Sequence, residues 1–255
     1  MNTDMQNNTG NSDPLEEHVL HFWQPYTFKT AEGYDYLRRG FFKRLSNTLL
    51  RIVVAILFNP LNRMILGLKV EGRENIRKVK HKGYVFITNH VHAVDCTFID
   101  CLIPFKRLYY VTLESNFQIP VVRHLIRILN AIPIPSSTRC IKEFLDNMDK
   151  AIAYGSVVCM YPECYLLPYY KGVRKFKKGA FHIAIKNKCP ILPMVVTFRE
   201  PDGIFRYIKK NPCITITVLN PVYTENMGNT IKDEINLMET CQTIMKSYAD
   251  SMHNL

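Results

Sequence analysis

From Val70 onward, the chain alternates between short apolar runs and longer amphipathic segments. Segments with an apolar period of about 3.6 residues predict helices over 96–103, 141–155, from Gly179 and from Thr230. Short apolar runs between them predict strands over 84–88, 108–113, 157–161, 191–198 and 214–219. This alternation is typical of an α/β domain with a mostly parallel sheet flanked by helices. No repeat or linker divides residues 70–255, so we expect a single domain there.

The first 69 residues follow a different pattern. Residues 1–17 are polar, lack an apolar signal region and are predicted to be a disordered tail. Residues 18–69 are first aromatic and then mix basic with apolar positions, and their apolar centre, 49–58, includes Arg51. That centre is shorter than the roughly 20 residues that span a bilayer. Pro60 is expected to end or kink a helix, so we predict two short amphipathic helices.

Basic residues on both sides of this apolar centre favour a position in the membrane interface, with cations toward lipid head groups. The alternative is a helical hairpin packed on the core of the domain. Deletion of residues 1–68 is then expected to abolish vesicle binding while leaving a folded α/β domain.

Charge and cysteine content narrow the partners and the compartment. The 255 residues carry a formal net charge of +11, which suits an anionic membrane surface, nucleic acid or a phosphorylated substrate. No recognised nucleic-acid motif is found, so we expect no nucleic-acid partner. The eight cysteines lack Cys-x-x-Cys spacing and are predicted to be reduced. We therefore expect a peripheral or monotopic protein at the cytoplasmic face of a membrane.

The candidate chemistry begins where the strand 84–88 ends. His90 and Asp95 are separated by four residues at the junction with the next helix. A histidine can accept a hydroxyl proton near neutral pH, and a nearby carboxylate can orient it. Alone, the spacing is also compatible with a pair that only caps the helix. A metal site that adds His92 is a weaker alternative, and His92 is expected to be a hydrogen-bonded neighbour.

A second polar block follows the strand 157–161. Pro162 stops that strand and places Glu163 at the carboxyl edge of the sheet, where ligands of open α/β sheets collect. The basic stretch that includes Lys171 and Arg174 precedes Gly179, which opens a helix. Helix amino termini favour anions, although such a stretch can also be a solvated surface.

Taken together, these blocks resemble the glycerophospholipid acyltransferase family, which includes the 1-acylglycerol-3-phosphate acyltransferases. The resemblance covers about residues 70–221 and rests on five ordered blocks: Val-Glu-Gly-Arg-Glu-Asn at 70–75, Asn89-His90 through Asp95, Ile119-Pro120 with 131–134, Tyr161-Pro162-Glu163 with 176–181, and 189–193.

The resemblance implies acyl transfer from acyl-CoA or acyl carrier protein to a lysophospholipid, most simply 1-acylglycerol-3-phosphate. His90 would be the general base and Asp95 its orienting carboxylate, with no metal or cofactor. It further implies substrate binding by Asn89 and Glu163, with Lys171 or Arg174 replacing a missing arginine.

Three positions that the family directs toward phosphate differ here. Cys164-Tyr165-Leu166 follows Glu163 in place of Gly-Thr-Arg, Leu113-Glu114 stands where lysine is common, and Pro135-Ser136 stands in place of Asp-Arg. Another lipid acceptor, or a catalytically silent lipid-binding role, therefore remains an alternative.

Overall fold

The computed structural model describes residues 27–223 and 230–253, so the predicted tail 1–17 and most of the aromatic segment lie outside it. Seven strands form one sheet in the order β1-β7-β6-β2-β5-β3-β4. They are β1 (Lys69–Glu71), β2 (Tyr84–Thr88), β3 (Leu108–Leu113), β4 (Ala131–Ile134), β5 (Val157–Met160), β6 (Ile191–Arg199) and β7 (Cys213–Val218).

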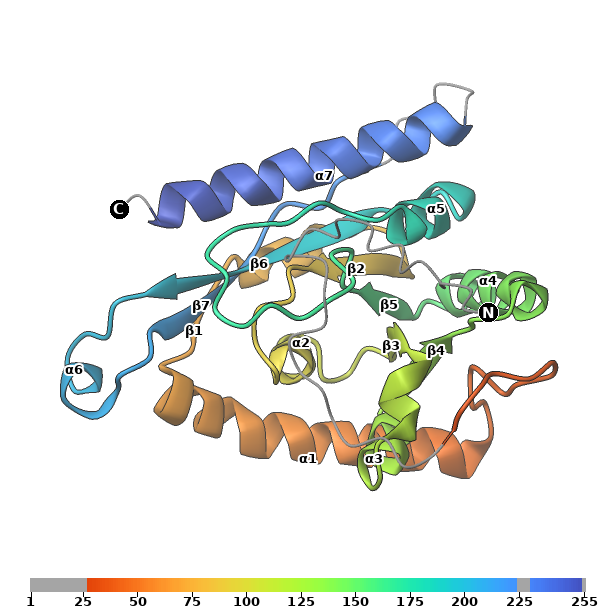
Figure 1. Cartoon of the computed structure of the whole chain (residues 1–255), viewed down its shortest axis with the longest axis horizontal. Helices are drawn as coiled ribbons and strands as arrows, with labels where there is room; N and C mark the ends of the chain where they lie inside the picture. Colours follow the sequence, from red (N-terminus) through yellow and green to blue (C-terminus); the bar gives the residue numbers. More distant parts are fainter. Residues whose placement is uncertain (1–26, 224–229, 254–255) are drawn as a thin grey trace, which may run out of the picture.

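Helices cover both faces of this sheet (Figure 1). They are α1 (Phe41–Leu66), α2 (Asp95–Leu102), α3 (Val122–Ile128), α4 (Thr138–Ala153), α5 (Gly179–Lys186), α6 (Phe205–Ile208) and α7 (Thr230–His253). In the view of Figure 1, α5 and α7 lie above the sheet, α1, α2 and α3 lie below it, and α4 lies at its right end. Buried residues of α4 join those of α5 and α7 in one cluster. The predicted α/β architecture is confirmed.

The central strands are mostly apolar along their length because helices cover them on both faces. All five residues of β2 are buried, and they alternate between two cores. Val85 and Ile87 join the cluster under α4, α5 and α7, whereas Tyr84 and Phe86 join the cluster around α2. Strands β2 to β6 run in one direction, with β2 parallel to its neighbour β6. Strand β7 is antiparallel to β6, and β1 is parallel to β7, so β1 and β7 run the opposite way. The parallel register aligns the carboxyl ends of β2 and β5, where His90 and Glu163 follow.

The prediction of two short helices before Leu68 is wrong, because α1 is a single helix of 26 residues that continues through Pro60. A proline inside a helix removes one hydrogen bond and crowds the preceding turn. Side chains on both sides of Pro60 hold the two halves in line. Arg51 is bound to Asp100 before it, and Asn62 donates to Thr97 Oγ1 after it.

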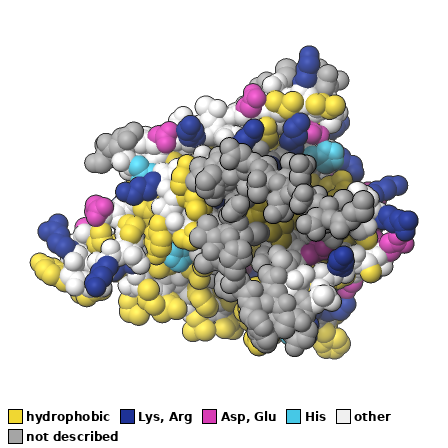
Figure 2. Space-filling model, viewed as in Figure 1, with side chains coloured by type: hydrophobic (Ala, Val, Ile, Leu, Met, Phe, Trp, Pro, Cys, Tyr) yellow, Lys and Arg dark blue, Asp and Glu magenta, His cyan; other side chains and the backbone are white. Residues whose placement is uncertain are grey.

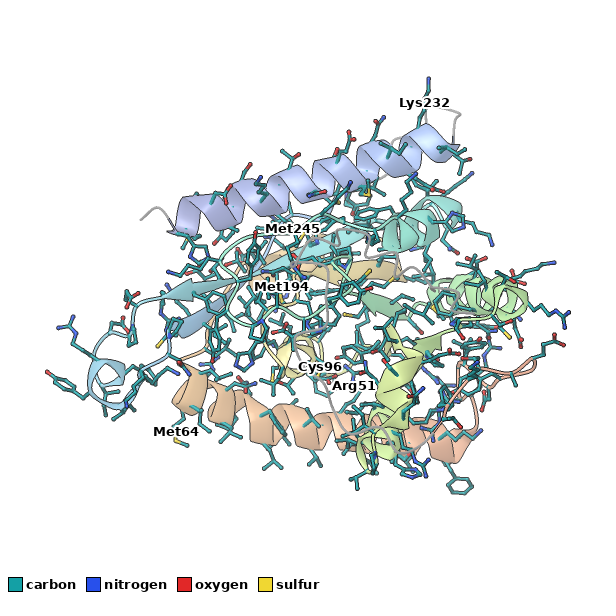
Figure 3. All side chains as sticks on the ribbon, in the orientation of Figure 1. Arg51, Met64, Cys96, Met194, Lys232 and Met245 are labelled. Atoms are coloured by element: carbon teal, nitrogen blue, oxygen red, sulfur yellow. The ribbon has the colours of Figure 1, made fainter. Side chains whose placement is uncertain are left out.

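Helix α1 turns its polar face toward the domain and its apolar face outward, the reverse of an amphipathic helix in a water-soluble domain. Its buried residues are Asn47, Arg51, Val54 and Asn62, three of them polar. Figure 3 shows Met64 pointing away from the body, whereas Arg51 points inward near Cys96 of α2. The exposed large apolar side chains along α1 are Phe41, Phe42, Leu45, Leu49, Val53, Ile56, Leu57, Leu61, Met64 and Ile65.

The segment just before α1 lies against the domain. Tyr36 is only 1% exposed, and its ring packs edge-on against Phe144 of α4. Glu114 accepts hydrogen bonds from the backbone and the hydroxyl of Thr30. Residues 27–40 are therefore part of the folded body, whereas α1 exposes a row of large apolar side chains.

Candidate active site

The loop between β2 and α2 is fixed to the sheet by Asn89. Its side-chain amide donates to the carbonyl of Val196 at 2.9 Å and accepts from the N–H of Val196 at 2.8 Å. Asn89 is fully buried, so both ends of its amide are used to attach the loop to β6. The structure therefore gives Asn89, expected to bind substrate, a role in holding the neighbouring His90.

Asp95, the first residue of α2, draws the loop into a tight turn around one carboxylate oxygen. Oδ2 of Asp95 lies 3.1 Å from Nδ1 of His90 and accepts from the N–H groups of Val91 and His92 at 3.0 and 3.1 Å. The Asp95 residue is 1% exposed. A carboxylate held by three donors in a buried site is well suited to orient an imidazole and to stabilise its positive charge.

His90 is placed for proton transfer. When Nδ1–H donates to Asp95, Nε2 is left as the proton acceptor. The ring stacks on Tyr161 with centroids 4.2 Å apart, and the His90 side chain is 24% exposed. The imidazole is thus fixed on two sides and still reachable. The sequence signal for Tyr161 is an aromatic residue directly before Pro162-Glu163, which does not by itself predict stacking on His90.

Glu163 lies in the same site but is turned into the protein. Its side chain is fully buried and binds Arg174 through Nε at 3.0 Å and Nη2 at 2.8 Å. Oε1 of Glu163 also accepts the backbone N–H of Arg174, and Oε2 lies 3.3 Å from the N–H of His90. The pair thus ties the loop after β5 to the loop that carries His90. The two residues, expected to contact substrate, contact each other.

The loop that carries Lys171 runs along the turn that carries His90. Backbone N–H groups of Leu167 and Tyr169 donate to the carbonyls of His90 and Val91. Lys171 is exposed, and its positive charge adds to the effect of burial in lowering the pKa of His253 at the end of α7. Of the two cations expected to replace the missing arginine, Lys171 is the exposed one.

His92 is a hydrogen-bonded neighbour of the pair. Burial lowers its pKa below the usual 6.5, the Asp95 charge opposes this and Lys209 adds to it. Its Nδ1 lies 3.4 Å from the N–H of Val94, and its ring packs edge-on against Tyr169. Among the described residues, no group of three or more His, Cys, Asp and Glu side chains could hold a metal ion.

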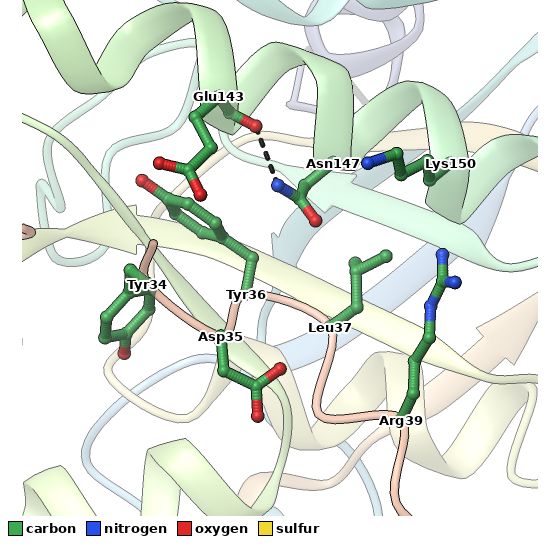
Figure 4. Close-up of a pocket in the computed structure, with 8 residues that line it drawn as sticks. All are labelled: Tyr34, Asp35, Tyr36, Leu37, Arg39, Glu143, Asn147 and Lys150. Carbon is green, nitrogen blue, oxygen red and sulfur yellow. Dashed lines mark hydrogen bonds between the residues drawn. The ribbon is translucent and has the colours of Figure 1, made fainter. Parts of the chain in front are cut away.

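A pocket of about 280 Å³ lies elsewhere, between the segment 34–39 and α4 (Figure 4). It is lined by Tyr34, Asp35, Tyr36, Leu37, Arg39, Glu143, Asn147 and Lys150. None of these residues belongs to the cluster around His90, so this pocket is separate from the candidate active site.

Comparison with solved structures places the fold. The chain superposes on the crystal structure of the 1-acyl-sn-glycerophosphate acyltransferase PlsC from Thermotoga maritima with a TM-score of 0.59 and 19% sequence identity. The match covers 86% of this chain and 85% of that one. At this identity, the likeness supports a shared fold.

Sequence comparison gives relatives that agree with this fold. A 1-acyl-sn-glycerol-3-phosphate acyltransferase of Saccharomyces cerevisiae is 26% identical over 80% of this chain and 66% of its own length. An uncharacterized acyltransferase of Schizosaccharomyces pombe is 30% identical over 70% of this chain and 64% of its own length. The chain thus spans about two thirds of the length of these relatives. The family model described as Acyltransferase matches residues 67–197, about half of the chain and the part that contains His90, Asp95 and Glu163. The chain therefore belongs to this acyltransferase family.

Proposed function

We propose that this protein transfers a fatty acyl group from acyl-CoA or acyl carrier protein to the free hydroxyl of 1-acylglycerol-3-phosphate at a membrane surface. The observation that carries the proposal is the 3.1 Å contact between Nδ1 of His90 and Oδ2 of the buried Asp95. Relatives from yeast and human are named as 1-acyl-sn-glycerol-3-phosphate acyltransferases, which supports this acceptor.

The reaction needs only proton transfer and a leaving thiol. Nε2 of His90 takes the proton from the acceptor hydroxyl while its oxygen attacks the thioester carbonyl carbon. The carbon–sulfur bond then breaks, and the thiolate takes the proton from the imidazolium. Asp95 stabilises the positive charge on His90 between these steps. The products are an ester, here phosphatidic acid, and the free thiol of the donor.

The membrane part of the proposal rests on how α1 is attached. By length and composition, α1 is apolar enough to cross a bilayer. Its polar face is nevertheless bound to the domain at several points, including the carbonyl of Ile128 through Asn47 and Asp100 through Arg51. A spanning helix would have to break these contacts and leave polar groups in lipid. We therefore propose that α1 lies in the plane of one leaflet, with its apolar face toward the acyl chains.

The acceptor head group is the finer part of the proposal. Because Arg174 is engaged with Glu163, we assign phosphate recognition to Lys171 and give Arg174 a positioning role through Glu163. A lysolipid with another head group is the second candidate acceptor, since only one of the two cations expected to replace the missing arginine is exposed.

The test is an acyl-transfer assay with one labelled acyl-CoA and a panel of lysolipid acceptors. His90→Ala should lower kcat by about 10²–10⁴-fold, the usual contribution of a general base. His81→Ala, at an exposed histidine ahead of β2, is the matched control and should keep parental activity. Activity of His90→Ala within a fewfold of the parent would contradict base catalysis, and a neutral acceptor preferred over lysophosphatidic acid would contradict the assigned head group.

A further inference from the structure

A groove of about 400 Å³ lies where the last turn of α1 meets β1 and the hairpin that joins β6 to β7. Its lining comes from two separate stretches of the chain, 63–70 and 199–205: Arg63, Gly67, Leu68, Lys69, Val70, Arg199 and Phe205. Figure 1 places this junction at the end of the molecule where α6 approaches α1. None of the lining residues takes part in the His90 cluster.

The groove is strongly basic for its size. Three of its seven lining residues are cations, and none of the seven is acidic. Arg199 is held by hydrogen bonds to the carbonyls of Gly67 and Ile214, and Arg63 donates to Asn59. Lys69 forms an ion pair with Glu71 at 2.7 Å, outside the lining. The three cations of an acid-free lining therefore favour an anionic group in the groove.

The rim of the groove is apolar and protrudes into solvent. On α6, Ile204 just before the helix, Tyr207 and Ile208 are 70%, 85% and 64% exposed. On the last turns of α1, Met64 and Ile65 are 66% and 52% exposed. These exposed apolar side chains are too far out to pack in the core of the domain, and such a cluster is typical of an interaction surface.

The two parts of the rim are joined. Nζ of Lys209 donates to the carbonyl of Ile65 at 2.7 Å, so the hairpin and the end of α1 are held together. Figure 2 shows hydrophobic side chains along the lower edge, over α1, and again at the left tip, where α6 lies. The rim therefore continues the apolar face of α1.

We propose that this groove binds the head group of an anionic phospholipid while the tip of α6 enters the same leaflet as α1. The cations of the groove can bind lipid phosphate groups at the membrane surface, and the exposed apolar residues of the rim can insert among the acyl chains beneath them. A protein partner would need a complementary apolar surface along all of α1, whereas a bilayer supplies one to every element at once. The proposal rests on the membrane orientation given above for α1.

The experiment measures cosedimentation of the full chain with vesicles made of equal parts phosphatidylcholine and phosphatidylglycerol, compared with pure phosphatidylcholine. Arg63→Gln with Lys69→Gln should weaken binding to the anionic vesicles by roughly 25-fold, taking about fivefold for each cation near the surface. The matched control is Lys232→Gln with Lys246→Gln on α7, across the sheet from α1, and should change binding by less than about twofold.

A second pair of variants tests the rim. Ile204→Ser with Ile208→Ser should weaken binding to both kinds of vesicle by about tenfold or more, because apolar area no longer enters the leaflet. Ile231→Ser with Ile244→Ser, at exposed apolar positions of α7, is the control and should bind as the parent does.

The outcomes separate this proposal from its alternatives. Equal loss in the α7 and groove variants would overturn it, because the effect would then follow net charge alone. Displacement of the vesicles by millimolar inorganic phosphate would also overturn it, since the groove would then be a site for a free anion. Vesicle binding requires no catalysis, so failure of His90→Ala to lose activity would contradict the proposed function and leave the groove standing. Conversely, if the groove variants bind vesicles as the parent does and His90→Ala is inactive, only the groove proposal is contradicted.

Discussion

Arg51→Met should destabilise the protein strongly, because Arg51 attaches α1 to the domain through a buried ion pair. Nε of Arg51 lies 2.6 Å from Oδ1 of Asp100, and the guanidinium also donates to the carbonyls of Ile103 and Lys106. The two charged side chains are each 3% exposed. Methionine fills much of the same volume but leaves Asp100 buried without its cation.

The expected loss follows from that geometry. Removing one partner of a buried pair costs about 3–5 kcal/mol of unfolding free energy, because the remaining charge is uncompensated. Replacing both partners with apolar residues of similar volume is often nearly neutral. Arg51→Met combined with Asp100→Leu should therefore recover most of the loss. Urea unfolding followed by far-ultraviolet circular dichroism, with a fixed concentration of nonionic detergent to cover α1, measures all three variants.

The pH dependence of the single variant provides a second check. Burial already raises the pKa of Asp100 above its usual 3.8, and Arg51 opposes that rise. Without Arg51 the folded pKa should rise further. An acid whose pKa is raised by folding loses stability as the pH increases above the unfolded value. The penalty of Arg51→Met should accordingly shrink as the solution is acidified toward the pKa of the unfolded carboxyl group.

Two results would refute this account. One is a single-variant loss below about 1 kcal/mol, the size expected of a surface ion pair. The other is a double variant no more stable than the single one, because the loss would then come from packing and not from the buried charge of Asp100.

The remaining predictions concern the site itself. Lys171→Ala should raise KM for lysophosphatidic acid at least about tenfold, as expected for a lost charge-assisted contact. Lys175→Ala, at another exposed position of the same loop, should leave KM unchanged. Equal KM values for the two variants in a steady-state assay would exclude Lys171 from phosphate recognition. Arg174→Gln should lower the unfolding free energy by about 3–5 kcal/mol because the carboxylate of Glu163 stays buried, and Arg174→Lys should recover part of it; a thermal melt unchanged from the parent would contradict the pairing. Folding lowers the pKa of His92, so the unfolded chain binds a proton first as the pH falls through 6.5, and the folded state loses stability there. His92→Gln should therefore flatten the decline of melting temperature over that range. An unchanged slope would assign the decline to other groups.

The sequence determined the features that depend on residues close together in the chain. A two-residue period or a short apolar run bounded by turn residues indicates a strand, and β2 and β3 were predicted with their observed bounds. The pair His90 and Asp95 also lies within one turn, so its motif could be recognised before the fold was known. Edge strands were missed, because β1 has three residues and β4 contains Pro133, which weakens the strand pattern.

Tertiary structure decided what depends on contacts between distant segments. Glu163 and Arg174 were expected to face substrate, but folding brings them together because a buried carboxylate needs a cation. The groove of Arg63, Lys69 and Arg199 likewise joins segments that are far apart in sequence. For α1, the pattern showed a polar and an apolar stripe but not which one faces inward. Asp100 on α2 decided it: that carboxylate binds Arg51 inside the protein, so the apolar stripe is left outside.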